Sequence, residues 1–408
     1  MHPTAGEFPY SPVPTPKSMP EPIPSGPCAG PALQPLDEIL DGLDVCLRAP
    51  EADREHAATA AAALLADPGL VGRSMRCAAR VLSANDLSRD TGRELLRVAF
   101  LAAARRLAAG GEAPAAACEP LEALRRRAEA EPRPGPGAVL QAGLPLLEDD
   151  GVPRRVLEAL AHRYSNASRT AAAVARDAVL SGLVLRLVNS PFYGIGRRID
   201  ALERAVAFMG ANELSALALA VGALRRFGDA GALAPGWRLR AVTTGVAAKL
   251  LARRTGASGE WFFAAGLLRD AAGLVLAGLA PARSALVWRL AVEQSRPLEA
   301  VRQEWFDFDP AEASGWLLEA WGLPTPLGDL VRHADVPEGA GDARGAAILH
   351  VAGVLAAVGA AGERRGPSAP RLDPEAWAGL GLPAGALGRV ALEAADQAFA
   401  MRRVLEAA

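Results

Sequence analysis

The sequence LVLRLVNSPFYG, residues 183–194, decides the fold by joining an apolar helical run to a distinctive turn. The turn combines a polar pair, two adjacent aromatics and a glycine, which are Asn189, Ser190, Phe192, Tyr193 and Gly194. The polar pair can satisfy backbone groups at the end of a helix, and the glycine can adopt a positive φ. The aromatic pair can lock the turn into a core. We favour this structural role, and direct contact with a ligand or partner is the alternative.

Helical spacing of apolar residues continues on both sides of this block. Residues 139–408 show apolar runs separated by short Gly/Pro punctuation, without strand-like alternation. Residues 35–131 show the same spacing and predict a small helical domain of unknown family. Proline and glycine are concentrated between the two, which predicts a linker at 132–138. Residues 1–34 are rich in proline, which removes backbone donors and fixes φ, so we predict a disordered tail there.

The composition limits the classes of partner. Half of the 408 residues are hydrophobic (50%), which is enough for at least one large core. The net charge of -2 leaves no global field that would hold a polyanion. We therefore expect a folded protein that has no nucleic-acid partner.

The cysteines and the apolar segments indicate a cytoplasmic protein. The four cysteines are widely spaced without a C-x-x-C pair, as expected of free thiols in a reducing compartment. The N-terminus lacks the basic and apolar regions of a signal peptide. Residues 345–362 carry no formal charge, but they are mostly Ala and Gly and include His350. A helix buried in a bundle explains this stretch better than a membrane span, so we expect no membrane partner.

The block at 183–194, with the apolar positions up to Gly210 that follow it, closely resembles the signature of the HDOD family, the HD-related output domains. Four other segments also resemble the family and occur in the family's order. They are Leu144-Pro145, the run 308–314 leading to Trp316, the turn 321–324 and the segment 348–352. The resemblance covers about residues 139–405. It implies an all-α chain, in which an HD-like multi-helical bundle follows the smaller helical domain and the disordered tail. It also implies a role in bacterial signal transduction.

The resemblance permits a test for HD-type chemistry, in which histidines and aspartates hold catalytic metals. The run 265–276 is similar to the segment that carries the family's namesake His-Asp pair, but arginine stands at the histidine position. The five positions that match expected ligands hold Arg240, Arg269, Asp270, Pro310 and Gly353. One carboxylate cannot hold a catalytic metal where three or four protein ligands are normal. We therefore expect a pseudoenzyme that has no metal or other cofactor.

Structural roles explain the polar groups that survive. We expect Asp270 to form a salt bridge with Arg269, Arg240 or another arginine. Asp309-Pro310 is a sound helix start, with Asp as the N-cap and Pro at the first helical position. His333 and His350 lack metal-binding spacing, and no aspartate follows at position 353. We interpret both as core or surface histidines.

Three functions remain open at this point. The leading one is a non-catalytic regulatory protein that binds an unknown protein partner or a small regulator. The alternative is a sensor of a nucleotide or another anionic ligand, in which Arg240 and Arg269 bind phosphate in the former metal pocket. A metal-dependent phosphohydrolase is the third and least favoured function.

Overall fold

The computed structural model describes most of the chain after residue 118. The described residues are 91, 119–148, 151–162, 166–189, 193, 195–227, 234–257, 261–294, 296–360, 372–383 and 385–405. The predicted tail, the four cysteines and nearly all of the predicted small domain lie outside these residues.

Helices are the main secondary structure of the described residues, which contain no β-strand. This confirms the all-α prediction. In the first half they are α5 (Leu121–Ala130), α6 (Pro136–Gly143), α7 (Pro145–Glu148), α8 (Val152–Ala161), α9 (Ala167–Ala175), α10 (Ala178–Val188), α11 (Leu202–Met209) and α12 (Ala211–Phe227). They continue with α13 (Ala234–Thr255), α14 (Phe262–Leu268), α15 (Ala271–Leu279), α16 (Pro281–Glu293), α17 (Leu298–Phe306), α18 (Pro310–Ala320) and α19 (Thr325–Arg332). The remainder are the 3-10 helix η2 (Pro337–Gly339), α20 (Ala343–Ala360), α21 (Pro374–Gly379) and α22 (Gly385–Leu405).

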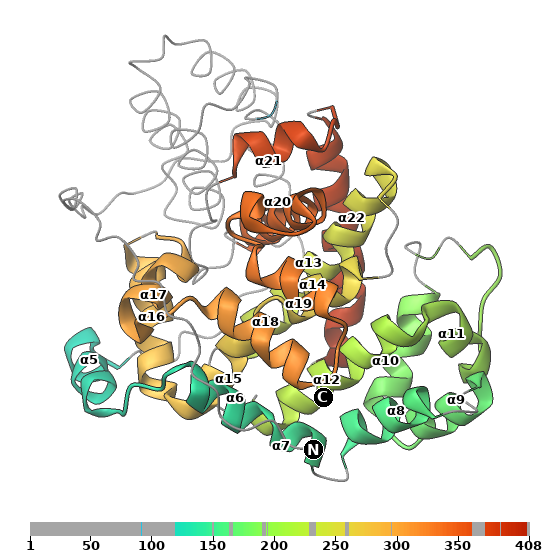
Figure 1. Cartoon of the computed structure of the whole chain (residues 1–408), viewed down its shortest axis with the longest axis horizontal. Helices are drawn as coiled ribbons and strands as arrows, with labels where there is room; N and C mark the ends of the chain where they lie inside the picture. Colours follow the sequence, from blue (N-terminus) through green and yellow to red (C-terminus); the bar gives the residue numbers. More distant parts are fainter. Residues whose placement is uncertain are drawn as a thin grey trace, which may run out of the picture.

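The bundle is organised around the long helix α13. This helix packs against α14, α20 and α22, while α12 packs against α8, α14 and α15. Helices α8 to α11 gather at one end of the molecule, and α5 lies at the opposite end beside α16 (Figure 1). Helix α12 therefore joins the α8 to α11 end to the centre of the bundle.

Glycines allow α13 and α14 to cross closely. A Cβ atom at Gly266 would lie 2.6 Å from the Cα atom of Gly245, and one at Gly245 would lie 2.8 Å from the carbonyl oxygen of Phe263. A side chain at either position would push the two backbones apart. This crossing fixes the C-terminal end of α14, where Arg269 follows.

Residues 345–360 of the charge-free stretch lie in α20, and the residues from Gly345 to Val358 are buried in the bundle, as predicted. A different segment is long and apolar enough to cross a membrane, namely Phe262–Leu279. Within the fold, 83% of that segment is buried, and Arg269 and Asp270 interrupt it between α14 and α15. It is a core segment of the bundle.

The predicted linker at 132–138 is partly helical. Residues 132–135 are extended, whereas α6 begins at Pro136, because proline is well suited to the first turn of a helix. Helix α5, from the end of the predicted small domain, packs against α16. The described part that precedes the linker is therefore in contact with the bundle.

Candidate functional site

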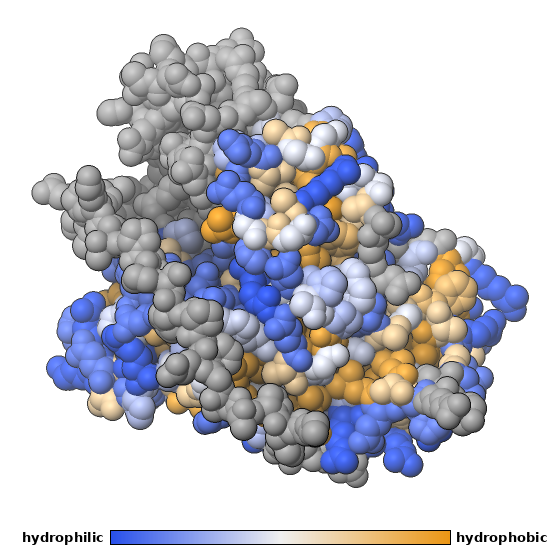
Figure 2. Space-filling view, viewed as in Figure 1, coloured by the Kyte–Doolittle hydropathy of each residue, from blue (hydrophilic) through white to orange (hydrophobic). Residues whose placement is uncertain are grey.

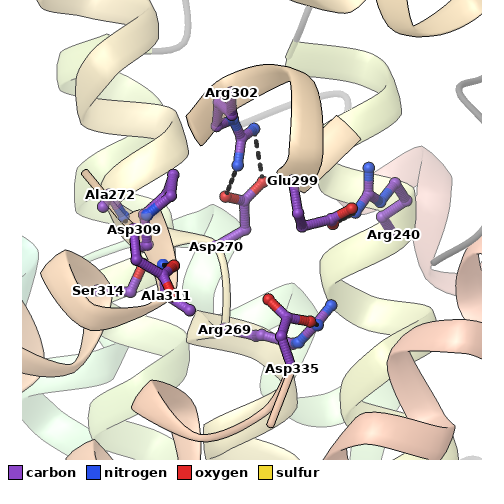
Figure 3. A network of polar contacts seen from close by, with 11 residues as sticks. Arg240, Arg269, Asp270, Ala272, Glu299, Arg302, Asp309, Ala311, Ser314 and Asp335 are labelled. Carbon is purple, nitrogen blue, oxygen red and sulfur yellow. Dashed lines mark hydrogen bonds and ion pairs between the residues drawn. The ribbon is translucent and has the colours of Figure 1, made fainter. Parts of the chain in front are cut away.

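Three of the positions that the HDOD resemblance matches to metal ligands, Arg240, Arg269 and Asp270, belong to one cluster of charged side chains (Figure 3). Arg240 comes from α13, Arg269 and Asp270 from the junction of α14 and α15, and Gly353 from α20. Pro310 begins α18. Three carboxylates and one arginine complete the cluster, which are Glu299 and Arg302 of α17, Asp309 before α18 and Asp335 after α19. We call these side chains the ion-pair cluster.

Arg269 fills the space that a side chain at position 353 would need. A Cβ atom at Gly353 would lie 2.6 Å from Nη1 and 2.9 Å from Cζ of Arg269. The guanidinium forms an ion pair with Asp335, and the Arg269 side chain is only 10% exposed. Burial opposes the positive charge, but Asp335, Glu299 and nearby carboxylates outweigh it and raise the pKa of Arg269. A permanent cation therefore lies at a position that the HDOD resemblance matches to a metal ligand.

Glu299 connects two of the predicted ligand positions. Its Oε1 accepts a hydrogen bond of 2.9 Å from Nη2 of Arg240, and both side chains are mostly buried. Burial would raise the pKa of Glu299, yet Arg240, Arg269 and Arg302 lower it to about 2. Arg240 and Arg269 thus share one cluster, with a carboxylate that stays ionised between them.

The predicted arginine partner of Asp270 is Arg302. Two hydrogen bonds join the guanidinium of Arg302 to the carboxylate, and the bond between Nη2 and Oδ2 is 3.1 Å long (Figure 3). Gly273 makes room for this pair, because a Cβ atom there would lie 2.2 Å from Oδ1 of Asp270 and 2.7 Å from Nη1 of Arg302. Parallel bonds of this kind fix the orientation of both side chains.

The start of α18 has the predicted N-cap. Oδ1 of Asp309 accepts a hydrogen bond of 2.8 Å from the backbone N–H of Ala311. Burial raises the pKa of Asp309, and Asp335 adds to this effect by repulsion. Pro310 occupies the first helical position, and Ser314 accepts a hydrogen bond from the backbone N–H of Ala272. The start of α18 is thereby tied to the start of α15.

The side chains of the cluster are not suited to hold a catalytic metal. Three guanidinium groups face four carboxylates, and a cation repels a second cation at the same place. His350 uses both ring nitrogens, since Nδ1 lies 2.9 Å from the carbonyl oxygen of Ala334 and Nε2 accepts a 3.0 Å hydrogen bond from the N–H of Asp373. The described residues contain no group of three or more His, Cys, Asp or Glu side chains arranged for a metal.

The motif turn is anchored by Asn189 and Tyr193. Asn189 donates to the carbonyl oxygens of Leu185 and Ile199, at 2.8 and 2.6 Å, and accepts from the N–H of Ile199 at 2.7 Å. These bonds close the loop between α10 and α11. Ser190, Phe192 and Gly194 lie outside the described residues, so the predictions for these three positions stay open.

Tyr193 docks this loop onto α12 and α13. Its hydroxyl donates to the buried carboxylate of Glu213, which also forms an ion pair with Lys249. The ammonium of Lys249 lies 4.3 Å from the centre of the Tyr193 ring. Burial, together with Glu213, raises the pKa of Tyr193, so its hydroxyl remains a donor. The contacts of Asn189 and Tyr193 are those of the structural role.

Glu299, Arg302 and Asp335 were not predicted from the sequence. None of them lies in a recognisable motif, and Arg302 is 32 positions away from its partner Asp270. The available signal was Gly353, where the resemblance leads to an aspartate, together with Gly273, three residues after Asp270. A missing side chain beside a buried arginine leaves the volume that a guanidinium needs.

The fold is that of a helical domain of HD type, in which ion pairs occupy the positions that the resemblance matches to metal ligands. The model of the HDOD domain family matches residues 145–337. This chain carries an HDOD domain, as the sequence motif predicted.

Several solved structures are similar to this chain. A protein provisionally assigned to signal transduction, from Marinobacter aquaeolei, is 18% identical with a TM-score of 0.48, over 80% of this chain and 68% of that one. An HDOD domain protein with unknown function from Geobacter sulfurreducens is 19% identical with a TM-score of 0.44, over 66% and 97%. A protein provisionally assigned as a phosphohydrolase, from Shewanella amazonensis, is 21% identical with a TM-score of 0.43, over 69% and 98%. Comparison with proteins of curated function gave no match.

Proposed function

We propose that this chain is a non-catalytic signal-transduction protein of the bacterial cytoplasm, which acts by binding a protein partner through its degenerate HD domain. The ion-pair cluster carries this proposal. Arginine takes the place of the namesake histidine, and its guanidinium occupies the space beside Gly353. Arginine cannot lose its proton under physiological conditions, so it cannot become a metal ligand.

The cluster suits a structural role in a regulatory domain. Its members come from α13, the junction of α14 and α15, α17 and the segments that flank α18 and α19. Buried ion pairs contribute little net stability compared with apolar residues, but breaking one leaves a buried charge without its partner. A cluster of this kind therefore favours one relative arrangement of its helices.

The anion sensor remains the second candidate, because Arg240 and Arg269 do share a cluster. Their charges are balanced by Glu299 and Asp335, so a phosphate group would have to displace at least one carboxylate. That requirement weakens the candidate. A phosphohydrolase is weaker still, since the residues at the matched positions do not fit the metal that its chemistry needs.

Metal content and hydrolysis of the purified full chain test the absence of catalysis. After incubation with Mn²⁺ and gel filtration, we expect no stoichiometric metal by mass spectrometry, and no hydrolysis of bis-p-nitrophenyl phosphate above a heat-denatured blank. One metal per chain together with hydrolysis would overturn the proposal. Isothermal titration with inorganic phosphate and with a nucleoside triphosphate tests the sensor, and saturable binding that is lost in Arg240→Ala would favour it.

The partner is tested in native cells with the full chain carrying an affinity tag. We expect one protein to co-purify in stoichiometric amount and to re-form the complex when it is purified and mixed with this chain. Failure of every co-purified protein to rebind would contradict a partner-binding role.

A further inference from the structure

We propose that residues 119–135, which we call the strap, form a releasable clamp that couples the N-terminus of α16 and the C-terminus of α17 to the ion-pair cluster. The inference rests on the proposed function, because it describes how that same cluster is regulated. The strap consists of α5 and the extended residues around it, and it lies against α16 at the edge of the molecule (Figure 1).

Glu131 holds the strap to the N-terminus of α16. Its two carboxylate oxygens accept hydrogen bonds of 2.9 Å from the backbone N–H groups of Ala282 and Arg283. These N–H groups belong to the first turn of a helix and have no partner inside the helix, and the helix dipole favours a negative charge beside them. A side chain of the strap thus supplies the cap of a helix in the bundle.

Arg283 extends this contact from α16 to α17. Its Nη2 donates a hydrogen bond of 2.8 Å to the backbone carbonyl of Glu131, and its guanidinium lies 5.9 Å from the ring centre of Trp305 on α17. Arg283 is only 4% exposed, so its charge depends on these neighbours. Removal of the strap would take away its hydrogen bond to Glu131.

A second contact joins the strap to the end of α17. Asp307, which follows α17, has a left-handed backbone conformation with φ of 59°, and its carboxylate forms an ion pair with Arg133 of the strap. Non-glycine residues rarely adopt this conformation without support from their surroundings. The strap therefore contacts both the N-terminus of α16 and the C-terminus of α17.

The other end of α17 belongs to the ion-pair cluster. Glu299 contacts Arg240, and Arg302 contacts Asp270. Glu299 and Arg302 lie within one turn of each other on α17, which has nine residues. A helix of this length is about 13 Å long and moves as a rigid rod. A displacement of its C-terminal end would therefore change the distances within the cluster.

The strap is attached mainly by polar contacts, which makes it releasable. Of residues 119–135, only Leu124, Ala128 and Pro134 are buried. Hydrophilic side chains cover this edge of the molecule (Figure 2). A cleft of about 480 Å³ is lined by residues of the strap, α16 and α17, which are Glu129, Glu131, Arg133, Arg283, Glu304 and Trp305. The ion pair of Arg133 and Asp307 is exposed, and exposed ion pairs are weak and screened by salt, so this contact of the strap belongs to the less stable part of the fold.

Hydrogen exchange of the full chain, measured by mass spectrometry, tests the coupling. We compare Glu131→Ala with Glu129→Ala, an exposed residue that lines the same cleft. In Glu131→Ala we expect roughly tenfold faster exchange in residues 281–286 and also in residues 298–306, as the loss of charge-assisted bonds predicts. Glu129→Ala should leave both segments unchanged.

Each other outcome overturns the proposal. Faster exchange in residues 281–286 alone would reduce Glu131 to a local cap, and no change in either segment would mean that the strap is not held there. If Glu131→Ala does not fold, Arg133→Ala replaces it, because this pair is exposed and its loss leaves the core intact. Exchange in residues 298–306 should then be about two- to fivefold faster, because an exposed pair contributes less than about 1 kcal/mol, and no change there would overturn the proposal. The assay involves neither metal nor hydrolysis, so its failure is separate from failure of the proposed function.

Discussion

Replacement of Arg269 by alanine should strongly destabilise the domain. The guanidinium is 10% exposed and its partner Asp335 is 28% exposed, so the pair is mostly but not completely buried. Loss of one member of a fully buried pair costs about 3–5 kcal/mol, because the other charge remains without compensation. Since water reaches Asp335 in part, we expect the lower end of that range, about 3 kcal/mol.

Urea unfolding followed by circular dichroism at 222 nm measures this cost. Asp335→Ala in the Arg269→Ala background should recover part of it, because it removes the unpaired carboxylate, with a coupling of about 1–2 kcal/mol. Arg204→Ala is the matched control, since Arg204 and Asp200 form an exposed pair on the surface, and its effect should stay below about 0.5 kcal/mol. A cost for Arg269→Ala as small as that of Arg204→Ala, or strict additivity in the double variant, would refute the reasoning.

Three further predictions concern other polar contacts of the bundle. Burial lowers the pKa of His350 in the folded protein below the value of about 6.5 in the unfolded chain. The stability that the neutral form contributes is therefore complete above about pH 6.5 and is lost as the pH falls towards the folded pKa. His350→Gln should flatten the pH dependence of the free energy of urea unfolding between about pH 7.5 and 5.5. Asn189→Ala should destabilise by about 1–3 kcal/mol and accelerate proteolysis between α10 and α11, because the contacts with Ile199 are lost. Lys249→Met should cost about 3 kcal/mol in urea unfolding, since it leaves the charge of Glu213 buried, whereas adding Glu213→Gln should restore part of the loss.

The fold class was predictable because its signals are local. Apolar residues at helical spacing, Gly/Pro punctuation and the turn at 189–194 each depend on neighbours in the chain. The helix start at Asp309-Pro310 follows from the same short-range chemistry and has the predicted cap.

The partners in the ion-pair cluster were not predictable, because they depend on contacts between distant helices. Asp270 could have paired with many arginines, and only the fold, which brings Arg302 of α17 to the start of α15, selects this pair. The strap shows the same limit. A composition rich in proline and glycine indicates a linker, but it does not reveal that Glu131, at its edge, caps α16.

The two glycines explain how the bundle accommodates the ion-pair cluster in its close-packed interior. Gly353 leaves room for Arg269, and Gly273 leaves room for the pair of Asp270 and Arg302. An arginine introduced without such a glycine would meet a side chain in a close-packed interior, and a glycine introduced without the arginine would leave a cavity. Each change is therefore tolerated best in the presence of the other. For the same reason, an aspartate restored at position 353 alone would meet the guanidinium of Arg269 and add an ion pair to the cluster, so that a metal site would also require Arg269 to be replaced.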